Sequence, residues 1–177
     1  MIDPREYGKA LFLLAEERGS SKAVGEDLKT VKAVLEQNPD YLLLLDTPAV
    51  KSEEKCALID KAFADIDRDV VNFLKILSEK HEVYNFPRCA DTFGALLDES
   101  LGILRAQVVS AVPLSDSQKE RLSKKLGFET GKTVLLSNTV DPSLLGGVQL
   151  RYAGVQIDGS LAGRLSALEK AIRESAI

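Results

Sequence analysis

Residues 134–168 read VLLSNTVDPSLLGGVQLRYAGVQIDGSLAGRLSAL, and no other part of the chain carries so specific a pattern. The run 134–136 is a short apolar strand candidate, and the Asp-Pro-Ser triplet at 141–143 is typical of a turn, because proline fixes φ. The pair Gly146-Gly147 opens a second strand over 148–152, where apolar and polar residues alternate. Alternation with a period of two predicts a strand with one buried face.

The same stretch ends in a predicted helix. A third, shorter strand closes at Ile157, after which Asp158 and Gly159 supply a turn and Ser160 supplies an N-cap oxygen. Four apolar residues then recur at helical spacing and form one stripe, namely Leu161, Leu165, Leu168 and Ile172. The predicted order is strand, turn, strand, helix, with the short run at Ile157 before the helix.

In the first 105 residues, apolar side chains recur with the period of an α-helix instead. Asp3-Pro4 is a helix start, because aspartate caps free N–H groups and proline loses nothing at the first helical position. Apolar residues recur at spacings of three and four between breakers such as Gly19 and Pro39. The predicted helices cover 4–18, 21–37, 40–45, 52–63, 67–78 and 87–104. Their short connections favour antiparallel neighbours, so we expect a six-helix bundle.

The helical period ends near residue 105. The run 106–112 is rich in β-branched residues and is predicted to be a strand. Ser115 and Gln118 then have capping-box spacing for a helix that ends at Gly127. We therefore predict an α+β protein with two domains. A helical bundle occupies 1–105, and a smaller domain with a short β-sheet and two helices occupies 106–177.

Charge and composition exclude several classes of protein. Residues 1–105 contain 14 Lys and Arg against 20 Asp and Glu, whereas residues 106–177 contain 9 against 7. An acidic first part does not suit the phosphate backbone, so nucleic acid is not an expected partner. There is no pattern of a signal peptide or a membrane span, which makes the chain cytosolic by expectation. Cys56 and Cys89 fall at apolar helical positions and are interpreted as core residues.

A search for catalytic chemistry finds no complete constellation. Gly146-Gly147 lacks the Lys-Ser/Thr of a phosphate loop, and His81 lies in a polar loop without a recognisable nucleophile. The acidic run 65–69 lacks the ligand spacing of a calcium loop. We expect no cofactor and no metal. A basic patch is the remaining charged feature and is most often a solvated helix face, although it could meet an acidic partner: Lys119, Arg121, Lys124 and Lys125.

Two helices are apolar over more of their circumference than a surface helix needs. Helix 4–18 has an inward face of Tyr7, Ala10, Leu11 and Leu14, to which Phe12 and Leu13 are added. Helix 67–78 has four inward residues, Val70, Phe73, Leu74 and Leu77, to which Val71 and Ile76 are added. The surplus either completes the bundle core or offers a face to a partner helix. From its residues alone, the chain is thus interpreted as a two-domain interaction protein.

The succession DPSLLGGV, IDGS and LxGRLxxL, together with YGKALF at 7–12, resembles the delta subunit of bacterial F-type ATP synthases. The mitochondrial relative of that family is the oligomycin-sensitivity-conferring protein. The resemblance covers essentially the whole chain. It implies a non-catalytic stator subunit that links the catalytic head to the peripheral stalk and resists rotor torque during proton-driven ATP synthesis. It also implies a peripheral place on the cytoplasmic side of the cell membrane, with membrane association only through the complex.

The resemblance further implies two partners. In the family, the helical domain holds N-terminal helices of the alpha subunits, along its first and fifth helices, and the C-terminal domain engages the C-termini of the b subunits. The hypothesised alpha-subunit groove is Tyr7, Leu11, Phe12, Leu13, Val71 and Ile76. The hypothesised stalk-binding residues are Gly146, Gly147, Asp158, Ser160, Leu165 and Leu168.

Two other functions remain open at this point. The first is a cytosolic two-domain adaptor that binds partner helices outside ATP synthase, which would co-purify without any subunit of that enzyme. The second is a small enzyme acting on a nucleotide or acyl substrate, which would keep its turnover after separation from ATP synthase. No residue of the chain indicates the second function, that of a small enzyme.

Overall fold

The computed structural model describes residues 3–152, 154–161, 163 and 165. The chain divides into two compact units, Met1–Leu97 and Asp98–Ile177. We call them the helical unit and the C-terminal unit and describe each by itself. The division falls before the boundary at 105 expected from the change of period. The carboxylate of Asp98, at the start of the second unit, accepts a 2.9 Å hydrogen bond from Nη2 of Arg105.

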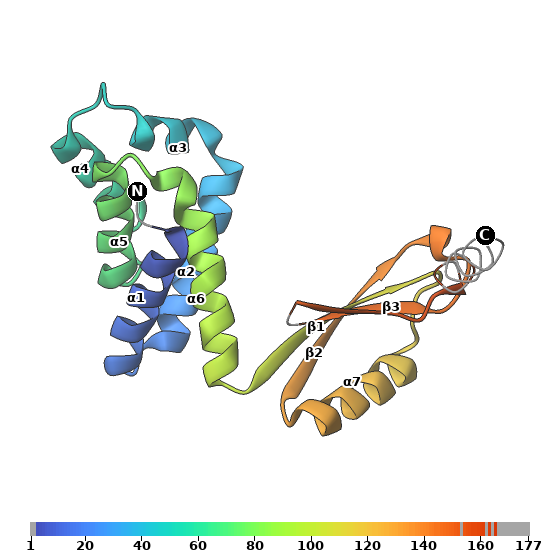
Figure 1. Cartoon of the computed structure of the whole chain (residues 1–177). Helices are drawn as coiled ribbons and strands as arrows, with labels where there is room; N and C mark the ends of the chain where they lie inside the picture. Colours follow the sequence, from blue (N-terminus) through green and yellow to red (C-terminus); the bar gives the residue numbers. More distant parts are fainter. Residues whose placement is uncertain (1–2, 153, 162, 164, 166–177) are drawn as a thin grey trace, which may run out of the picture. The chain divides into compact units, whose positions relative to one another are not determined.

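The helical part contains helices α1 to α6 (Figure 1). Their bounds are α1 Pro4–Glu17, α2 Ser21–Gln37, α3 Pro39–Asp46, α4 Ser52–Ala62, α5 Arg68–Glu79 and α6 Phe86–Ser100. A 3₁₀ turn, η1 (Val83–Asn85), lies between α5 and α6, where a loop was expected. The turn places Val83 in the core, where it is fully buried. The α+β class is confirmed, but this part is not the plain six-helix bundle that was predicted.

Aspartates begin two of these helices, as the sequence predicts. Asp3 Oδ1 accepts a 2.9 Å hydrogen bond from the backbone N–H of Arg5, and Pro4 occupies the first helical position. Asp67 Oδ1 accepts a 2.8 Å hydrogen bond from the backbone N–H of Asp69 at the start of α5. Each carboxylate satisfies a donor that has no partner inside the helix, which explains why the helices start there.

Helix α6 packs closely against α1 and α2 (Figure 1). A Cβ added to Gly8 of α1 would lie 2.5 Å from the carbonyl oxygen of Cys89, and one added to Gly25 of α2 would lie 2.7 Å from Cδ2 of Leu97. The ring of Phe93 is fully buried and meets the ring of Phe12 edge-on at 5.6 Å. The core around them includes Val24, Leu28, Val31, Leu35, Leu45, Ile59, Val70, Leu74, Leu77 and Phe86.

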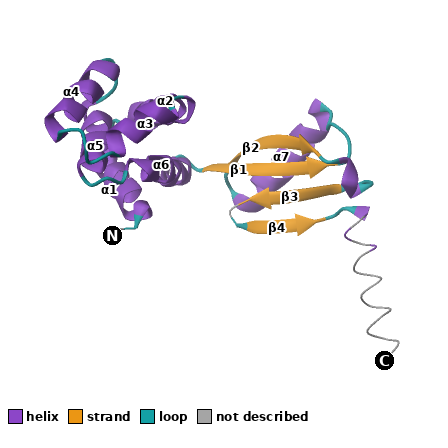
Figure 2. Ribbon diagram, turned by 90° about the horizontal axis from the view of Figure 1, so that it is seen from above, coloured by secondary structure: helices purple, strands orange, loops and turns teal. Residues whose placement is uncertain are grey.

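The C-terminal unit is a small sheet with a helix on one face (Figure 2). Its elements are β1 Ile103–Ser110, α7 Asp116–Thr130, β2 Thr133–Val140, η2 Pro142–Leu144, β3 Val148–Tyr152 and β4 Val155–Asp158. The strand order is β2-β1-β3-β4, with β1 parallel to β2 and both other pairs antiparallel. The parallel pair needs a crossover connection, and α7 supplies it. Together with α1 to α6, the described residues up to Asp158 therefore contain seven α-helices and a four-stranded sheet.

Alternate residues of the strands face α7 and form the core of this unit. Register pairs Val108 of β1 with Leu150 of β3, so that both point to one face of the sheet. Leu126 of α7 packs on them and is 4% exposed. The buried part of this core is small, comprising Ala106, Val108, Leu126 and Leu150.

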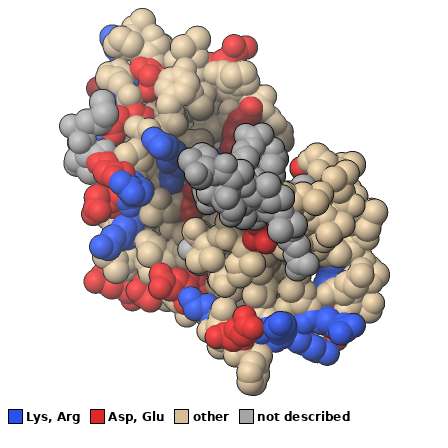
Figure 3. Space-filling model, turned by 45° about the vertical axis from the view of Figure 1, so that its right-hand side comes forward, with Lys and Arg blue, Asp and Glu red and all other residues tan. Residues whose placement is uncertain are grey.

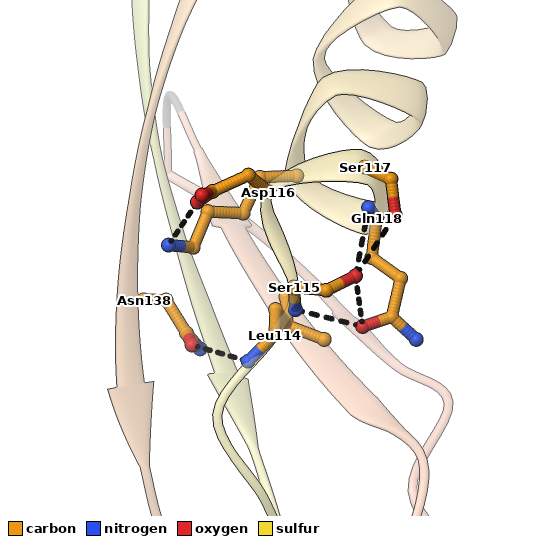
Figure 4. Close-up of polar contacts among 7 residues, drawn as sticks. Leu114, Ser115, Asp116, Ser117, Gln118 and Asn138 are labelled. Atoms are coloured by element: carbon orange, nitrogen blue, oxygen red, sulfur yellow. Dashed lines mark hydrogen bonds and ion pairs between the residues drawn. The ribbon is translucent and has the colours of Figure 1, made fainter.

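The predicted capping box at the start of α7 is confirmed (Figure 4). Ser115 Oγ accepts from the backbone N–H of Gln118 at 3.3 Å, and the Gln118 carboxamide oxygen accepts from the backbone N–H of Ser115 at 2.9 Å. The neighbouring N–H of Leu114 donates to Oδ1 of Asn138 on β2 at 3.0 Å, and Asn138 Nδ2 donates to the carbonyl oxygen of Val108 at 3.1 Å. Asn138 thus holds the start of the helix against two strands.

Several predicted boundaries in this unit are wrong. Helix α7 does not end at Gly127 but continues to Thr130, because the left-handed residue that closes it is Gly131, with φ +68°. Strand β1 begins at Ile103, and β2 extends to Val140, well beyond residue 136, because pairing with β1 holds its polar second half. In the predicted last helix, residues 161, 163 and 165 are helical. Leu168 and Ile172 lie outside the described residues.

Candidate partner-binding surfaces

Helices α1 and α5 contact each other at two points. Arg18 Nη1 pairs with Asp69 Oδ2 at 2.5 Å, and the rings of Tyr7 and Phe73 meet edge-on at 6.4 Å. The C-terminal end of α1 is therefore at the N-terminal end of α5, so the two helices run antiparallel. This pair of helices is the one that the sequence analysis selected for a partner site.

The positions of these contact residues show which other side chains of α1 and α5 lie on the same side of each helix. Successive residues of a helix are turned by about 100°, so residues at i, i+7 and i+11 lie on one line. Leu14 falls on the line of Tyr7 and Arg18, and Ile76 falls on the line of Asp69 and Phe73. Leu14 is 37% exposed and Ile76 is 44% exposed. We call Tyr7, Leu14 and Ile76 the α1–α5 surface; Phe73 itself is buried in the core.

The six residues hypothesised for the alpha-subunit groove do not share one surface. Leu11, Phe12 and Val71 are buried, Tyr7 is half-buried, and Leu13 and Ile76 are exposed. Leu13 is turned by about 100° from Leu14 and so leaves the α1–α5 surface. The burial of Phe12 and Val71 shows that half of the sequence surplus completes the core.

Leu14 was predicted to face the core, and this prediction is wrong. Its helical line carries Tyr7 and Arg18, which contact Phe73 and Asp69 of α5, and the side chain of Leu14 is 37% exposed. The core side of α1 is formed instead by Gly8, Leu11, Phe12 and Ala15, which face α6 and the other helices.

Val71 lies on the opposite side of α5, toward α4. It lines a hollow of about 530 Å³ together with Phe63, Ile66 and Lys75. Lys75 Nζ pairs with Asp60 Oδ1 of α4 at 2.5 Å at the rim of this hollow. The hollow is thus separate from the α1–α5 surface.

In the C-terminal unit, the signature glycines bring two backbone segments together. The backbone N–H of Gly159 donates to the carbonyl oxygen of Val148 at 2.9 Å, and the N–H of Leu161 donates to that of Gly146 at 3.0 Å. Gly147 has φ +77°, and a Cβ at this residue would lie 2.4 Å from the carbonyl oxygen of Gly159. No other residue type fits there without displacing backbone. Gly146 and Gly147 therefore have a structural role in joining β3 to the segment after β4.

Asp158 and Ser160 form the turn that the sequence predicts. Asp158 Oδ1 accepts from the backbone N–H of Ser160 at 2.8 Å, and its Oδ2 accepts from Nε2 of Gln149 at 3.1 Å. Ser160 Oγ accepts from the N–H of Gly163 at 3.0 Å, as an N-cap does. The hydrogen bonds from Ser160 hold the pKa of the Asp158 carboxyl below its usual range. Both residues shape the turn, and Ser160 itself is buried.

Exposed apolar side chains lie on both sides of the turn at Asp158 and Ser160 in the sequence. Val155 and Ile157 pair with Tyr152 and Leu150, so they point to the face of the sheet that carries α7. They are nevertheless 48% and 50% exposed, because they lie on the edge strand β4. Leu161 and Leu165 are exposed to a similar degree. We call Val155, Ile157, Leu161 and Leu165 the C-terminal apolar set.

The described residues hold no cluster of three or more His, Cys, Asp or Glu side chains able to bind a metal. His81 is exposed, and its Nδ1 donates to the carbonyl oxygen of Asp46 at 2.7 Å. Cys56 and Cys89 are free thiols, and burial raises the pKa of the Cys89 thiol to about 11, which disfavours the reactive thiolate. Within the same residues, no helix is long and apolar enough to cross a bilayer.

A helical unit joined to a small α/β unit, with apolar side chains exposed on both, defines a class of interaction subunit. The family model described as "ATP synthase delta (OSCP) subunit" matches residues 4–172. The chain belongs to this family, which contributes a peripheral-stalk subunit to F-type ATP synthase.

Individual relatives agree with this assignment. The chain is 36% identical over 172 residues to ATP synthase subunit delta of Anaeromyxobacter dehalogenans (strain 2CP-C), and the match covers 96% of each chain. It is 36% identical over 170 residues to ATP synthase subunit delta of Geobacillus sp. (strain WCH70), again with 96% of each covered. A chain in the cryo-EM structure of the Toxoplasma gondii mitochondrial ATP synthase hexamer has the same fold. The TM-score is 0.77 at 22% identity, with 97% of this chain and 98% of that chain covered.

Proposed function

We propose that the chain is a non-catalytic stator subunit, with one unit on the catalytic head and the other on the peripheral stalk. Membership of the ATP synthase delta (OSCP) family supports this role over that of an adaptor outside ATP synthase. A linker between head and stalk keeps the head from turning with the rotor, so that rotation drives conformational change in the catalytic subunits. Its place would be peripheral, on the cytoplasmic side of the cell membrane, with membrane contact only through the complex.

For the head, the proposed contact is the α1–α5 surface. An amphipathic N-terminal helix of an alpha subunit would bury Leu14 and Ile76, the exposed apolar residues on this surface. Each such anchor contributes about 1–3 kcal/mol when it is fully buried. The exposure of Leu14 and Ile76 between and beside the two α1–α5 contacts is the observation that carries this proposal.

For the stalk, the proposed contact is the C-terminal apolar set. Gly146, Gly147, Asp158 and Ser160 hold this set in place from within the unit. Leu165 belongs to the set, and Leu168, one helical turn further along the chain, lies outside the described residues. We propose that C-terminal segments of the b subunits cover these side chains.

Peptide binding tests the first contact. The full chain is titrated with an N-terminal peptide of the alpha subunit, and the affinity and the melting temperature are measured for Ile76→Ser, Leu14→Ser and Leu13→Ser. We expect the first two variants to bind about tenfold more weakly with little change in melting, because both side chains are exposed. Leu13→Ser is the matched control, since Leu13 is 50% exposed on another side of α1. Weaker binding by Leu13→Ser alone would move the contact elsewhere.

The second contact is tested with a C-terminal peptide of the b subunit. Ile157→Ser should weaken its binding, whereas Val112→Ser, at a residue that is 67% exposed in the loop after β1, should not. For the whole function, membranes depleted of the native subunit are supplemented with the chain, and ATP-driven proton pumping is measured. Restored pumping supports the stator role, and ATP hydrolysis that stays uncoupled contradicts it.

We also propose that the chain forms two separate domains that are connected at 101–102, between the end of α6 and the start of β1. Leu101 is 42% exposed and Gly102 has φ +64°, whereas β1 begins at Ile103 and is paired on both sides. Limited chymotrypsin digestion should therefore cut after Leu101 and leave β1 intact. Early cuts within 103–110 would contradict this division.

A further inference from the structure

Phe128 on α7 is exceptional among the phenylalanines of the chain. Its side chain is 92% exposed, whereas the other five phenylalanines are at most 7% exposed. The core of the C-terminal unit does not require Phe128, because α7 contacts this core through Leu122 and Leu126. Phenylalanine is also a weak helix former, so the local structure does not favour it there. Packing and propensity leave this side chain unexplained.

Cations lie on the same side of α7. Arg121, Lys125 and Phe128 are at i, i+4 and i+7, which places them on one line of the outer face of the helix. Neither cation has an ion pair with the described residues. In contrast, Lys119 and Lys124 are paired with Asp116 at 3.3 Å and with Glu120 at 2.6 Å. On the face shown in Figure 3, Lys and Arg side chains gather at the lower right. Within α7, the unpaired positive charge therefore lies beside the exposed ring.

We propose that the outer face of α7 binds an acidic segment of a partner chain. Carboxylates of the segment would pair with Arg121 and Lys125, and one of its apolar side chains would pack on Phe128. Charge complementarity selects this partner, because both unpaired cations flank the ring at helical spacing and would match carboxylates on a partner helix. An exposed aromatic ring next to cations also has the composition of an interface centre. This surface is separate from the α1–α5 surface and from the C-terminal apolar set.

A membrane surface is a poorer match for this face. A helix that lies in the lipid interface needs a broad apolar face opposite its cations. The broad apolar side of α7 already packs on the sheet through Leu122 and Leu126, and Phe128 is the large apolar side chain left outside. A protein segment with one apolar anchor matches this arrangement better than lipid does.

A designed peptide tests the proposal on the full chain. The probe is a helical peptide with glutamates four residues apart on both sides of a single leucine, and its binding is measured by calorimetry at low and moderate salt. Two variants are compared with the unmodified chain, namely Phe128→Ser and the double variant Arg121→Gln/Lys125→Gln. The controls are Leu43→Ser, at an apolar residue of α3 that is 59% exposed, and the double variant Lys9→Gln/Lys22→Gln, which changes net charge equally.

We expect each α7 variant to weaken binding at least about fivefold, the controls to have no effect, and salt to weaken binding. Melting temperatures should not change, because the altered side chains are exposed. Equal loss in the charge control would show a nonspecific effect of net charge and would overturn the proposal. Binding of phosphatidylcholine–phosphatidylglycerol vesicles in place of the peptide, lost in Phe128→Ser, would assign this face to a membrane and overturn it too. Neither outcome affects the contacts proposed for the head and the stalk.

Discussion

The two units are stabilised in different ways. The described residues of the helical unit include a cluster of 19 buried apolar side chains, whereas the corresponding cluster of the C-terminal unit contains four. The helical unit therefore has a core that can maintain its fold. The C-terminal unit depends more on its ladder of strands, on helix caps and on the close approach at Gly147. We expect core substitutions to dominate in the first unit and backbone substitutions in the second.

The largest effect is expected from Phe93→Ala. Phe93 is fully buried between α1 and α2 and touches Phe12, so truncation leaves a cavity in a packed core. Such a change costs about 3–5 kcal/mol of unfolding free energy, to be measured by urea denaturation. Phe128→Ala is the matched control, since the exposed ring should contribute less than about 0.5 kcal/mol. Similar losses for both variants would contradict the burial described for Phe93.

Gly147→Ala should have the next largest effect. The φ of +77° and the 2.4 Å approach to the carbonyl oxygen of Gly159 oblige the backbone to move. We expect a loss of about 1–3 kcal/mol, seen as faster hydrogen exchange at β3 and β4 amides. Gly131→Ala is the control, because Gly131 also has a positive φ but has open space around it. If the two variants behave alike, the φ angle alone determines the cost and the close approach contributes nothing.

Ser115→Ala should cost about 1 kcal/mol, because it removes one half of the capping box of α7. Thermal unfolding followed by circular dichroism would measure this change. Ser115→Thr keeps an oxygen acceptor and should retain most of the stability. A Thr variant as unstable as the Ala variant would show that the cap is not what the serine provides.

The smallest effect concerns the pH response of Asp158. Hydrogen bonds from Ser160 lower the pKa of its carboxyl in the folded state, so the unfolded chain binds a proton more readily. The stabilisation is therefore complete above the usual carboxyl pKa and is lost as the pH falls through the folded value. Because Asp158 is exposed, solvent screens the effect. Carboxyl NMR titration should show this low pKa, and Ser160→Ala, which removes the hydroxyl but keeps the backbone N–H, should raise it only in part; an unchanged pKa in that variant would assign the lowering to the backbone N–H.

Local signals predicted much of this fold. Asp3, Asp67 and Ser115 marked helix starts correctly, because a cap depends on residues that are adjacent in sequence. Strand β3 also followed from its alternation. The end of α7 was missed because two glycines follow each other at a spacing of four, and only the backbone angle distinguishes Gly127 from Gly131.

The candidate surfaces were predictable only in part. A helical wheel shows how broad an apolar arc is, but it does not tell which neighbouring helix covers each flank. Phe12 is covered by α6, and Val71 faces α4, whereas Leu14 and Ile76 remain open beside the α1–α5 contacts. Gly8 was the one local signal for the side of α1 that meets α6, since its missing side chain permits the close approach to Cys89. Phe128 was overlooked because a single apolar residue on a polar helix has no periodicity.

The position of β1 in the sheet has a mechanical consequence. The chain enters the C-terminal unit through Gly102 directly into β1, which is a central strand bonded to β2 on one side and to β3 on the other. The carbonyl oxygen of Gly102 already accepts a 2.8 Å hydrogen bond from Thr133 of β2. A tensile load on the chain at Gly102 would act on a strand that is bonded on both sides, so the hydrogen bonds of both ladders would resist its removal. An edge strand in the same position would be held by the hydrogen bonds of one ladder only.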